Sequence, residues 1–309
     1  MSAGTGVVPR PGSTRRRTLW QEIWRQRTAY LFIAPKYALF ILFVALPVLW
    51  AFLISLQEFR IFDTVWVGLD NFVQVFTSDL FWIALRNTVQ YAAVTVPANV
   101  LIALVLASLI FPLRSGAQTF FRAAYYLPTV AASVVIAMVW RWIFNYSYGL
   151  FNHILQLVGL ERVNWLGSSA FAMWSIILMQ VLTPPGTGVL LYLAAMGSIP
   201  QTLYEAAILD GASPYARWRH ITLPLLKPTT LYLVVLATIG SFQVFTPVLI
   251  MTQGGPGYST TTLVHMIFNT AFLDFNFGLA AALSVVLFAI IMVFAIFQFR
   301  WLSSDIEYS

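Results

Sequence analysis

The sequence predicts an all-α integral membrane protein with six transmembrane helices, and two observations support this fold class. Of the 309 residues, 60% are hydrophobic and only 9% are charged. Such a chain has too little polar surface to cover a water-soluble globule. In addition, six apolar stretches approach the roughly 20 residues with which a helix crosses a bilayer. These stretches cover 37–56, 88–111, 126–144, 170–196, 229–251 and 278–299.

The apolar stretches favour helices over the strands of a membrane barrel. Residues 283–291 are apolar on every face, whereas a barrel strand alternates apolar and polar residues. A helix also satisfies its own backbone hydrogen bonds inside the bilayer. The stretch 126–144 is shorter and carries Arg141 near its end, so a half-span or an interfacial helix is the alternative there.

The basic residues predict the orientation of the chain, because Lys and Arg next to spans are retained in the cytoplasm. With the N-terminus inside, 13 of the 17 Lys and Arg residues fall on the cytoplasmic side. Only Arg60, Arg86, Arg141 and Arg162 fall outside. We therefore expect both termini in the cytoplasm, with a basic, mostly disordered tail over 1–28, a membrane domain over 29–302 and a short cytoplasmic tail over 303–309. The basic residues are spread over several segments, so we expect no nucleic-acid partner.

The sequence lacks the features of a self-powered pump or an enzyme. The middle of each predicted span contains no Asp, Glu, Lys, Arg or His, although ion-coupled carriers need such groups there. No G-x-x-x-x-G-K-[ST] loop is present for nucleotide binding, and residues 254–257 are predicted to be a turn. The chain has no cysteine, and its three histidines lie in separate segments, so we expect no metal site. Any energy source must then lie in another chain.

The segment 197–228, between the fourth and fifth predicted spans, has the pattern of two short helices. Residues 201–209 favour a helix, and Gly211 can take the left-handed conformation that ends one. Ser213 is a predicted N-cap, and Pro214 suits the first turn of the second helix. We expect Leu223-Pro224 to end that helix.

The same segment carries a motif with a known spacing. Glu205-Ala206-Ala207, Gly211, Ile221 and Leu223-Pro224 resemble the EAA motif of permease subunits of bacterial ATP-binding-cassette importers. The stretches 68–72, 86–88, 122–128 and 251–256 are similar to the carbohydrate-importer branch related to the maltose permease. The resemblance extends from about residue 29 to the end of the chain.

This resemblance implies a multi-pass protein of the bacterial cytoplasmic membrane that works with three kinds of partner. These are a second permease subunit, two ATPase subunits that bind ATP and magnesium, and an extracytoplasmic solute-binding protein, all in contact with membrane lipid. The implied ATPase-coupling residues are Glu205, Ala206, Ala207, Asp210, Gly211, Ile221, Leu223 and Pro224. The alternatives are that 197–228 is a solvated amphipathic loop, and that the chain is a passive channel or a membrane-embedded assembly or scaffold protein.

A polar solute needs hydrogen-bonding groups and aromatic faces in a cavity near the middle of the bilayer. The candidates are Gln180, Thr183, Ser241, Phe242, Gln243, Phe245 and Thr246, close to the helix-breaking residues 184–186 and to Pro247. The alternative is that these polar side chains only bond neighbouring helices or their own backbone. By resemblance, 253–277 forms the outer surface for the solute-binding protein, or else a gate loop without a partner. The sequence leaves sugars, polyols and glycerol phosphates open as cargo.

Overall fold

The computed structural model describes residues 27–59, 64–183 and 185–302, and helices dominate these residues. The predicted N-terminal tail up to residue 26, the predicted C-terminal tail 303–309 and Pro184 lie outside them. The described chain begins with α2 (Arg27–Phe40), the π-helix η1 (Ile41–Ala45) and α3 (Leu46–Ile54). Next come β1 (Gln57–Phe59), β2 (Thr64–Trp66), α4 (Asp70–Thr77), α5 (Asp79–Ile110), α6 (Ser115–Val130), α7 (Ser133–Ile143), α8 (Leu150–Leu157), α9 (Ala172–Leu182) and α10 (Gly186–Gly197). The remaining elements are α11 (Gln201–Leu209), α12 (Pro214–Arg217), the π-helix η2 (Trp218–Thr222), α13 (Leu223–Leu225), α14 (Lys227–Phe242), α15 (Thr246–Met251), α16 (Leu263–Phe272) and α17 (Phe277–Leu302).

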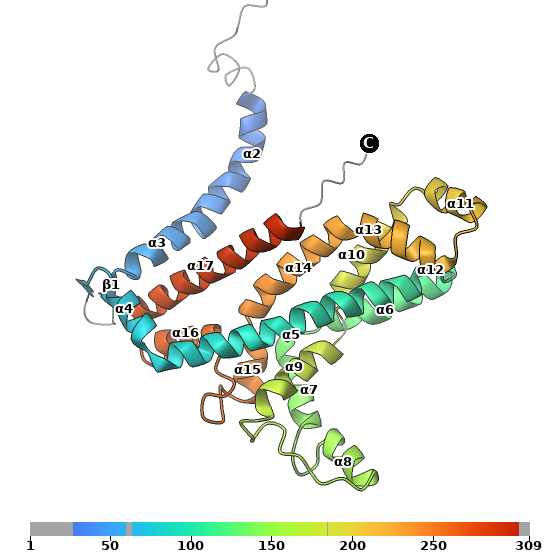
Figure 1. Cartoon of the computed structure of the whole chain (residues 1–309). Helices are drawn as coiled ribbons and strands as arrows, with labels where there is room; N and C mark the ends of the chain where they lie inside the picture. Colours follow the sequence, from blue (N-terminus) through green and yellow to red (C-terminus); the bar gives the residue numbers. More distant parts are fainter. Residues whose placement is uncertain (1–26, 60–63, 184, 303–309) are drawn as a thin grey trace, which may run out of the picture. The chain divides into compact units, whose positions relative to one another are not determined.

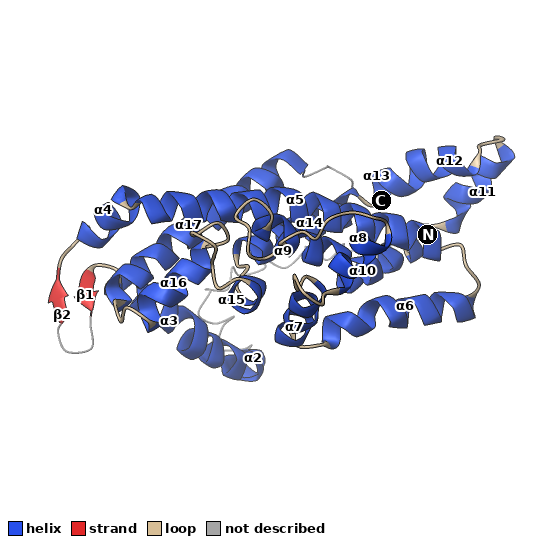
Figure 2. Cartoon of the chain, turned by 90° about the horizontal axis from the view of Figure 1, so that it is seen from below, coloured by secondary structure: helices blue, strands red, loops and turns tan. Residues whose placement is uncertain are grey.

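The all-α prediction is confirmed, apart from one hairpin that the sequence did not predict. Strands β1 and β2 pair antiparallel, with Gln57 opposite Trp66 and Phe59 opposite Thr64. They are the only strands in the described ranges (Figure 2). Three-residue strands carry too short an alternation to stand out from a turn in sequence.

Five of the six predicted spans appear as helical stretches long and apolar enough to cross a membrane. They are Tyr30–Ile54, Asp79–Ile110, Ala172–Gly197, Lys227–Met251 and Phe277–Trp301. The second begins nine residues before its predicted start at 88, because Arg86 and Asn87 interrupt the apolar run of its first turns. Two of the five contain internal breaks, between α9 and α10 and between α14 and α15.

The predicted span over 126–144 falls on two helices, α6 and α7, that together form one bent candidate span. Helix α6 begins at Ser115, and the chain turns by 93° between α6 and α7. Ala131 and Ala132 take extended backbone conformations at the turn. Pro128 lies one turn before the bend, where its missing N–H already weakens the helical ladder. Only when the bent pair is taken as one span does the number of apolar spans in the described residues reach six.

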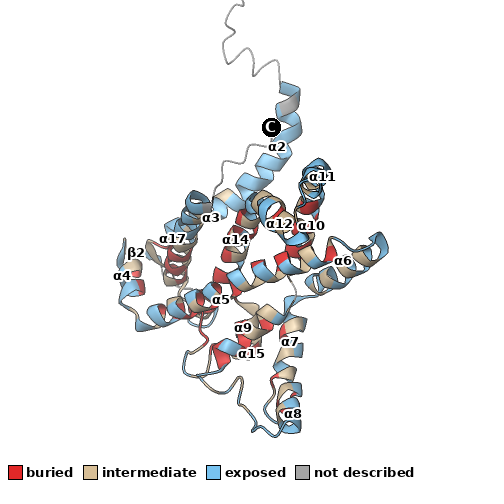
Figure 3. Ribbon diagram, turned by 45° about the vertical axis from the view of Figure 1, so that its right-hand side comes forward, coloured by how far each residue is buried: buried red, intermediate tan, exposed pale blue. Residues whose placement is uncertain are grey.

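The long helices of residues 52–302 pack around α5 and α14 (Figure 1). Helix α5 contacts α14, α10, α9 and α16, while α17 packs on α14 and α16. Buried residues follow the facing sides of α5, α14 and α17 (Figure 3), where Phe81, Phe242 and Leu283 belong to one apolar cluster. A second cluster joins α5, α10 and the start of α14 around the fully buried Tyr192 and Leu226.

The start of α17 lies against the hairpin through Gly278. A Cβ atom at this buried position would overlap the carbonyl oxygen of Gln57 and reach within 3.0 Å of the Phe59 nitrogen. Glycine is therefore required for the close approach of β1 to α17.

We expect Gly278→Ala to displace β1 and to lower the apparent melting temperature of the detergent-purified protein. The cost of overpacking, about 1–3 kcal/mol, corresponds to about 2–4 °C per kcal/mol for a chain of this size. Gly240→Ala is the control, because a Cβ there meets no atom within 4 Å. Equal melting temperatures of the two variants would contradict the packing role of Gly278.

Candidate functional site

Three interrupted helices meet at one cavity. The interruptions lie between α6 and α7, between α9 and α10, and between α14 and α15. A proline accompanies each: Pro128, Pro185 and Pro247, respectively. All three prolines line the same cavity of about 600 Å³. In hydrocarbon, unwound backbone is tolerated only where it is buried in protein or faces a polar cavity, so the convergence marks a place for water or a polar solute.

Local sequence explains the break between α14 and α15. Pro247 occupies the first turn of α15 and has no N–H to continue a helix from α14. Gln243 caps the end of α14 with φ −98° and ψ 17°, and Phe245 leaves the helical region entirely with φ −138° and ψ −61°. The chain therefore presents both side chains at the cavity rather than along a helix face.

The break between α9 and α10 depends on a close backbone approach. The Thr183 hydroxyl donates to the Met179 carbonyl at 2.8 Å, one turn back in α9. After Pro185, Gly186 begins α10 so close to α6 that a Cβ would overlap the Tyr125 carbonyl oxygen. Helix α10 thus reaches α6 at the cavity wall.

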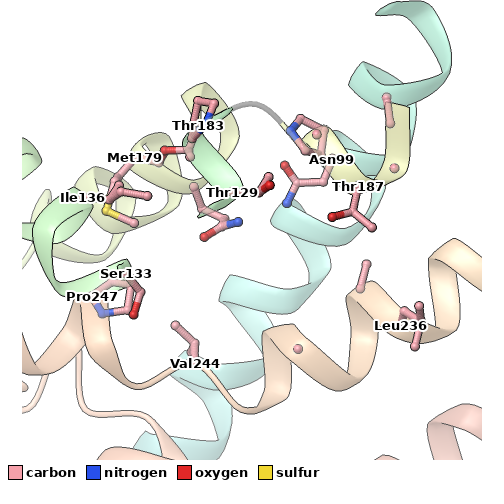
Figure 4. A pocket seen from close by; sticks show the side chains of 18 of the residues that line it. Asn99, Thr129, Ser133, Ile136, Met179, Thr183, Thr187, Leu236, Val244 and Pro247 are labelled. Atoms are coloured by element: carbon pink, nitrogen blue, oxygen red, sulfur yellow. The ribbon is translucent and has the colours of Figure 1, made fainter. Parts of the chain in front are cut away.

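The cavity wall is polar in places but carries no formal charge. Its polar side chains come from α5, α6, α7, α9, α10 and the α14–α15 break (Figure 4). They are Tyr91, Asn99, Thr129, Ser133, Gln180, Thr183, Thr187, Gln243 and Thr246. Among the described residues, no Asp, Glu, Lys, Arg or His lines the cavity. Such a wall suits hydrogen bonds with an uncharged polar molecule.

Five of the seven predicted pathway residues line this cavity: Gln180, Thr183, Gln243, Phe245 and Thr246. The structure places the other two elsewhere. The Ser241 hydroxyl lies 3.1 Å from that of Thr95 and joins α14 to α5. Phe242 is 3% exposed and packs on Phe294 of α17, with ring centroids 5.0 Å apart. Both point away because successive residues of a helix lie about 100° apart around its axis.

Sequence reasoning missed several polar residues of the cavity, and Asn99 is the most informative. Its buried Oδ1 has no hydrogen-bond partner within the described chain. A buried acceptor without a partner is uncommon, so Asn99 is a candidate to bind a donor when the cavity wall around it opens. Asn99 is the one amide in an apolar run that follows Pro97, and this pattern could have identified it. By contrast, Gln180 already accepts from the Tyr91 hydroxyl at 3.2 Å.

The segment between α10 and α14 has the predicted helix–turn–helix form. Helix α11 ends in a Schellman motif, in which Gly211 N donates to Ile208 O and Ala212 N donates to Ala207 O. Gly211 has φ +78°, the left-handed conformation that glycine adopts without strain. Ser213 caps α12 by accepting from Ala216 N at 3.2 Å, with Pro214 in the first turn. These predictions are confirmed.

The second helix ends at Leu225, one residue after the predicted end at Leu223-Pro224, so Pro224 lies within its last turn. The helical path runs from Pro214 through η2 and α13 to Leu225. In η2 the Leu223 N–H donates to the carbonyl of Trp218, five residues back. This wider turn gives the proline ring space that a regular helix lacks, so Pro224 is accommodated inside the helical path.

The coupling candidates divide by exposure. Glu205, Ala206, Asp210 and Gly211 are exposed, whereas Ala207, Ile221, Leu223 and Pro224 are half-buried. Beside the exposed group, Leu209 is 88% exposed and Tyr215 is 66% exposed. Large exposed apolar side chains around an acidic residue are typical of a surface that binds another protein.

One hydrogen bond ties this segment to the rest of the fold, and another ties its two helical parts together. Trp218 Nε1 donates to the Ser108 hydroxyl of α5 at 3.0 Å. The hydroxyls of Tyr204 and Thr222 lie 2.8 Å apart and join α11 to η2. The segment therefore cannot shift without moving its neighbours.

A single helix then leads from the segment to the cavity. Helix α14 begins at Lys227, directly after the fully buried Leu226, and ends where Gln243 enters the cavity wall. Sixteen helical residues span about 24 Å at 1.5 Å per residue.

Comparison with known proteins identifies the family. Residues 99–307 match the family described as the binding-protein-dependent transport system inner membrane component. The chain belongs to this family. The matched residues include both the cavity break points and the helix–turn–helix segment, and the resemblance noted in the sequence is confirmed.

Relatives and solved structures agree with this membership. The chain is 36% identical to the trehalose/maltose transport system permease protein MalF of Thermococcus litoralis, over 87% of this chain and 92% of that protein. It is 33% identical to the sn-glycerol-3-phosphate transport system permease protein UgpA of Escherichia coli, over 90% of this chain and 95% of that protein. A chain of a bacterial alginate ABC transporter, solved with an alginate pentasaccharide-bound periplasmic protein, superposes with a TM-score of 0.80 at 25% identity and covers 91% of this chain and 96% of its own. The family consists of transporter permease components of the inner membrane, not of enzymes.

We expect Gly211→Val to abolish most ATP-driven uptake in reconstituted vesicles. A β-branched residue at this φ costs on the order of 1–3 kcal/mol, and the turn relieves the strain by changing shape. Gly68→Val is the matched control, since Gly68 has φ +61° and, like Gly211, open space around its missing Cβ. Uptake that falls equally in both variants would show general damage rather than a role for the Gly211 turn.

Proposed function

We propose that this chain is one of two permease subunits of an ATP-driven importer, and that it carries an uncharged sugar or sugar-like solute through the cavity at the three helix breaks. The main support for this proposal is that Pro128, Pro185 and Pro247 line one partly polar cavity without charged side chains among the described residues. Its volume of about 600 Å³ suits a small saccharide.

The cavity chemistry supports a neutral cargo. Sugar hydroxyls donate and accept, and the wall offers both functions through amides, hydroxyls and the unpartnered Asn99 Oδ1. Phe245 adds an aromatic face for sugar C–H groups. An anionic cargo would lose its hydration here without a cation from this chain, at a large desolvation cost.

The exposed face of α11 is the proposed contact with a separate ATPase subunit, which binds the ATP and magnesium. Glu205 offers an anion to a partner cation, and Ala206 beside it permits close approach of another backbone. The positive-inside rule supports a cytoplasmic position, because Arg217, Arg219 and Lys227 lie in or next to this segment.

In the proposed cycle, α14 transmits the movement. Closure of the ATPase pair displaces η2 and α13, and α14 carries the displacement to Gln243 and the α14–α15 break. The cavity then opens toward the outer side, where a solute-binding protein delivers the cargo, and hydrolysis reverses the movement. The alginate transporter solved with its periplasmic protein supports the binding-protein step.

We expect Gln243→Ala to raise the half-saturating cargo concentration for transport about tenfold, the cost of roughly one hydrogen bond to a polar ligand. Gln74→Ala on α4 is the control, since Gln74 is exposed and does not line the cavity. The measurement is uptake of radiolabelled cargo by vesicles that contain equal amounts of complex. Parental kinetics for Gln243→Ala would remove this residue from the pathway.

We also expect the complex to import a neutral saccharide or polyol and to exclude phosphorylated solutes. The measurement is uptake and ATP hydrolysis with the cognate binding protein, when maltose or glycerol is compared with glycerol 3-phosphate. Uptake of glycerol 3-phosphate at the same rate would contradict the neutral-cargo assignment while leaving the importer class intact.

A further inference from the structure

Three buried asparagines hold backbone segments that the helices leave unsupported. Asn71, Asn87 and Asn152 are 5%, 7% and 2% exposed. Each donates its side-chain amide to backbone carbonyls outside its own helix, over 171 and 174 residues for Asn87, 14 and 16 for Asn71, and 6 and 11 for Asn152. Asn71 and Asn87 belong to stretches that resemble other permeases, yet the cavity and the coupling segment use neither residue.

Asn87 holds the loop that follows α15. From α5, its Nδ2 donates to the carbonyls of Tyr258 and Thr261, both at 2.9 Å. The adjacent Thr88 hydroxyl accepts from Leu263 N at 3.0 Å, which satisfies the first N–H of α16. Consecutive residues of α5 therefore fix both the loop and the helix that follows it.

The loop 252–262 is also braced from within. The hydroxyls of Thr260 and Thr261 donate to the carbonyls of Gly255 and Gly254, at 2.8 and 3.0 Å. The Thr262 hydroxyl donates to the Val244 carbonyl at 3.0 Å, which ties the loop to the cavity break.

Loop 252–262 is tightly packed against α16 at Gly254. A Cβ at Gly254 would lie 2.7 Å from the His265 ring. Burial lowers the pKa of His265, so the ring stays neutral and packs under the loop without a charge. A loop held by this many contacts is preorganised rather than adaptable.

Asn152 holds a second loop in the same manner. Its Nδ2 donates to the carbonyls of Tyr146 and Val163 at 3.1 and 3.0 Å. Its Oδ1 accepts from Val163 N and from the Trp165 indole at 3.0 and 3.1 Å. Asn71 likewise fixes the entry to the hairpin through Ser55 and Gln57. In the proposed orientation, all three held segments lie on the outer side of the membrane.

We propose that Asn87 is a positioning residue that fixes loop 252–262 as a preformed landing surface for the solute-binding protein. The inference rests on the proposed function only for the identity of the partner. A preformed surface binds with less loss of conformational entropy, so loosening the loop should weaken docking without affecting the later steps. Asn152 performs the same task for 145–165.

The test is a crossed pair of substitutions and spin labels. Because the chain has no cysteine, Tyr258→Cys and Tyr148→Cys each give a single labelling site. Both side chains are exposed, at 58% and 66%. Asn87→Asp and Asn152→Asp keep the side-chain shape but replace the donating amide by a group that only accepts. The spectra are recorded on the assembled complex in nanodiscs.

We expect Asn87→Asp to increase label mobility at 258 and not at 148, and Asn152→Asp to do the reverse. Without labels, Asn87→Asp should raise the binding-protein concentration for half-maximal ATP hydrolysis roughly tenfold, with the maximal rate retained. If Asn87→Asp prevents insertion, Asn87→Ala, which removes the donor without adding charge, is used for both measurements.

An immobile label at 258 in the Asn87 variant would contradict the proposal that Asn87 holds loop 252–262 in place. A mobile label with an unchanged half-saturating concentration would overturn the landing surface. Failure of the proposed function has a different signature, because the parental complex itself would then show no stimulation of ATP hydrolysis by its binding protein.

Discussion

The constraint on which this structure depends is the cost of an unpaired backbone group in hydrocarbon. Continuous helices such as α17 meet it internally, whereas the three proline-associated breaks cannot. Because the breaks face one another, a single, partly polar cavity serves all three. The placement of the breaks thus decides both where a polar solute can reside and which helices must surround it.

Most hydroxyls in the helices meet the same constraint by bonding their own backbone. Thr88, Thr95 and Thr238 each donate to a carbonyl four residues back. Because hydroxyl side chains bond their own helix in this way, composition alone could not separate the residues that line the cavity from those with a structural role. Gln243 and Ser241 are similar in sequence terms, yet only Gln243 follows the last turn of α14 and enters the cavity.

The helical class, five spans and the turn at Gly211 could be read from the sequence because each depends on local chemistry: apolar length, a left-handed glycine, a Ser-Pro cap. The position of the bend at Ala131, the passage of Pro224 through a π-turn and the hairpin depend on tertiary packing, and the local signal of Pro128 alone did not fix the bend. Asn99 and Asn87 lie between these cases. An amide in an apolar stretch is visible in the sequence. Whether it faces a cavity or a loop carbonyl is decided by the tertiary structure, and for Asn87 the partner carbonyls lie 171 and 174 residues away.

Helix α14 directly connects the segment 197–228 to the cavity, and this bears on the leakage of ions during transport. In the proposed cycle, one uninterrupted helix would carry the movement, so the nucleotide state of the partner and the exposure of the cavity would change in the same step. A mechanism built from successive side-chain rearrangements would pass through intermediates with both ends of the pathway open. Under the proposed coupling, a helix that begins beside the buried Leu226 and ends at the cavity would avoid such intermediates, and the membrane would keep its ion gradients during each cycle.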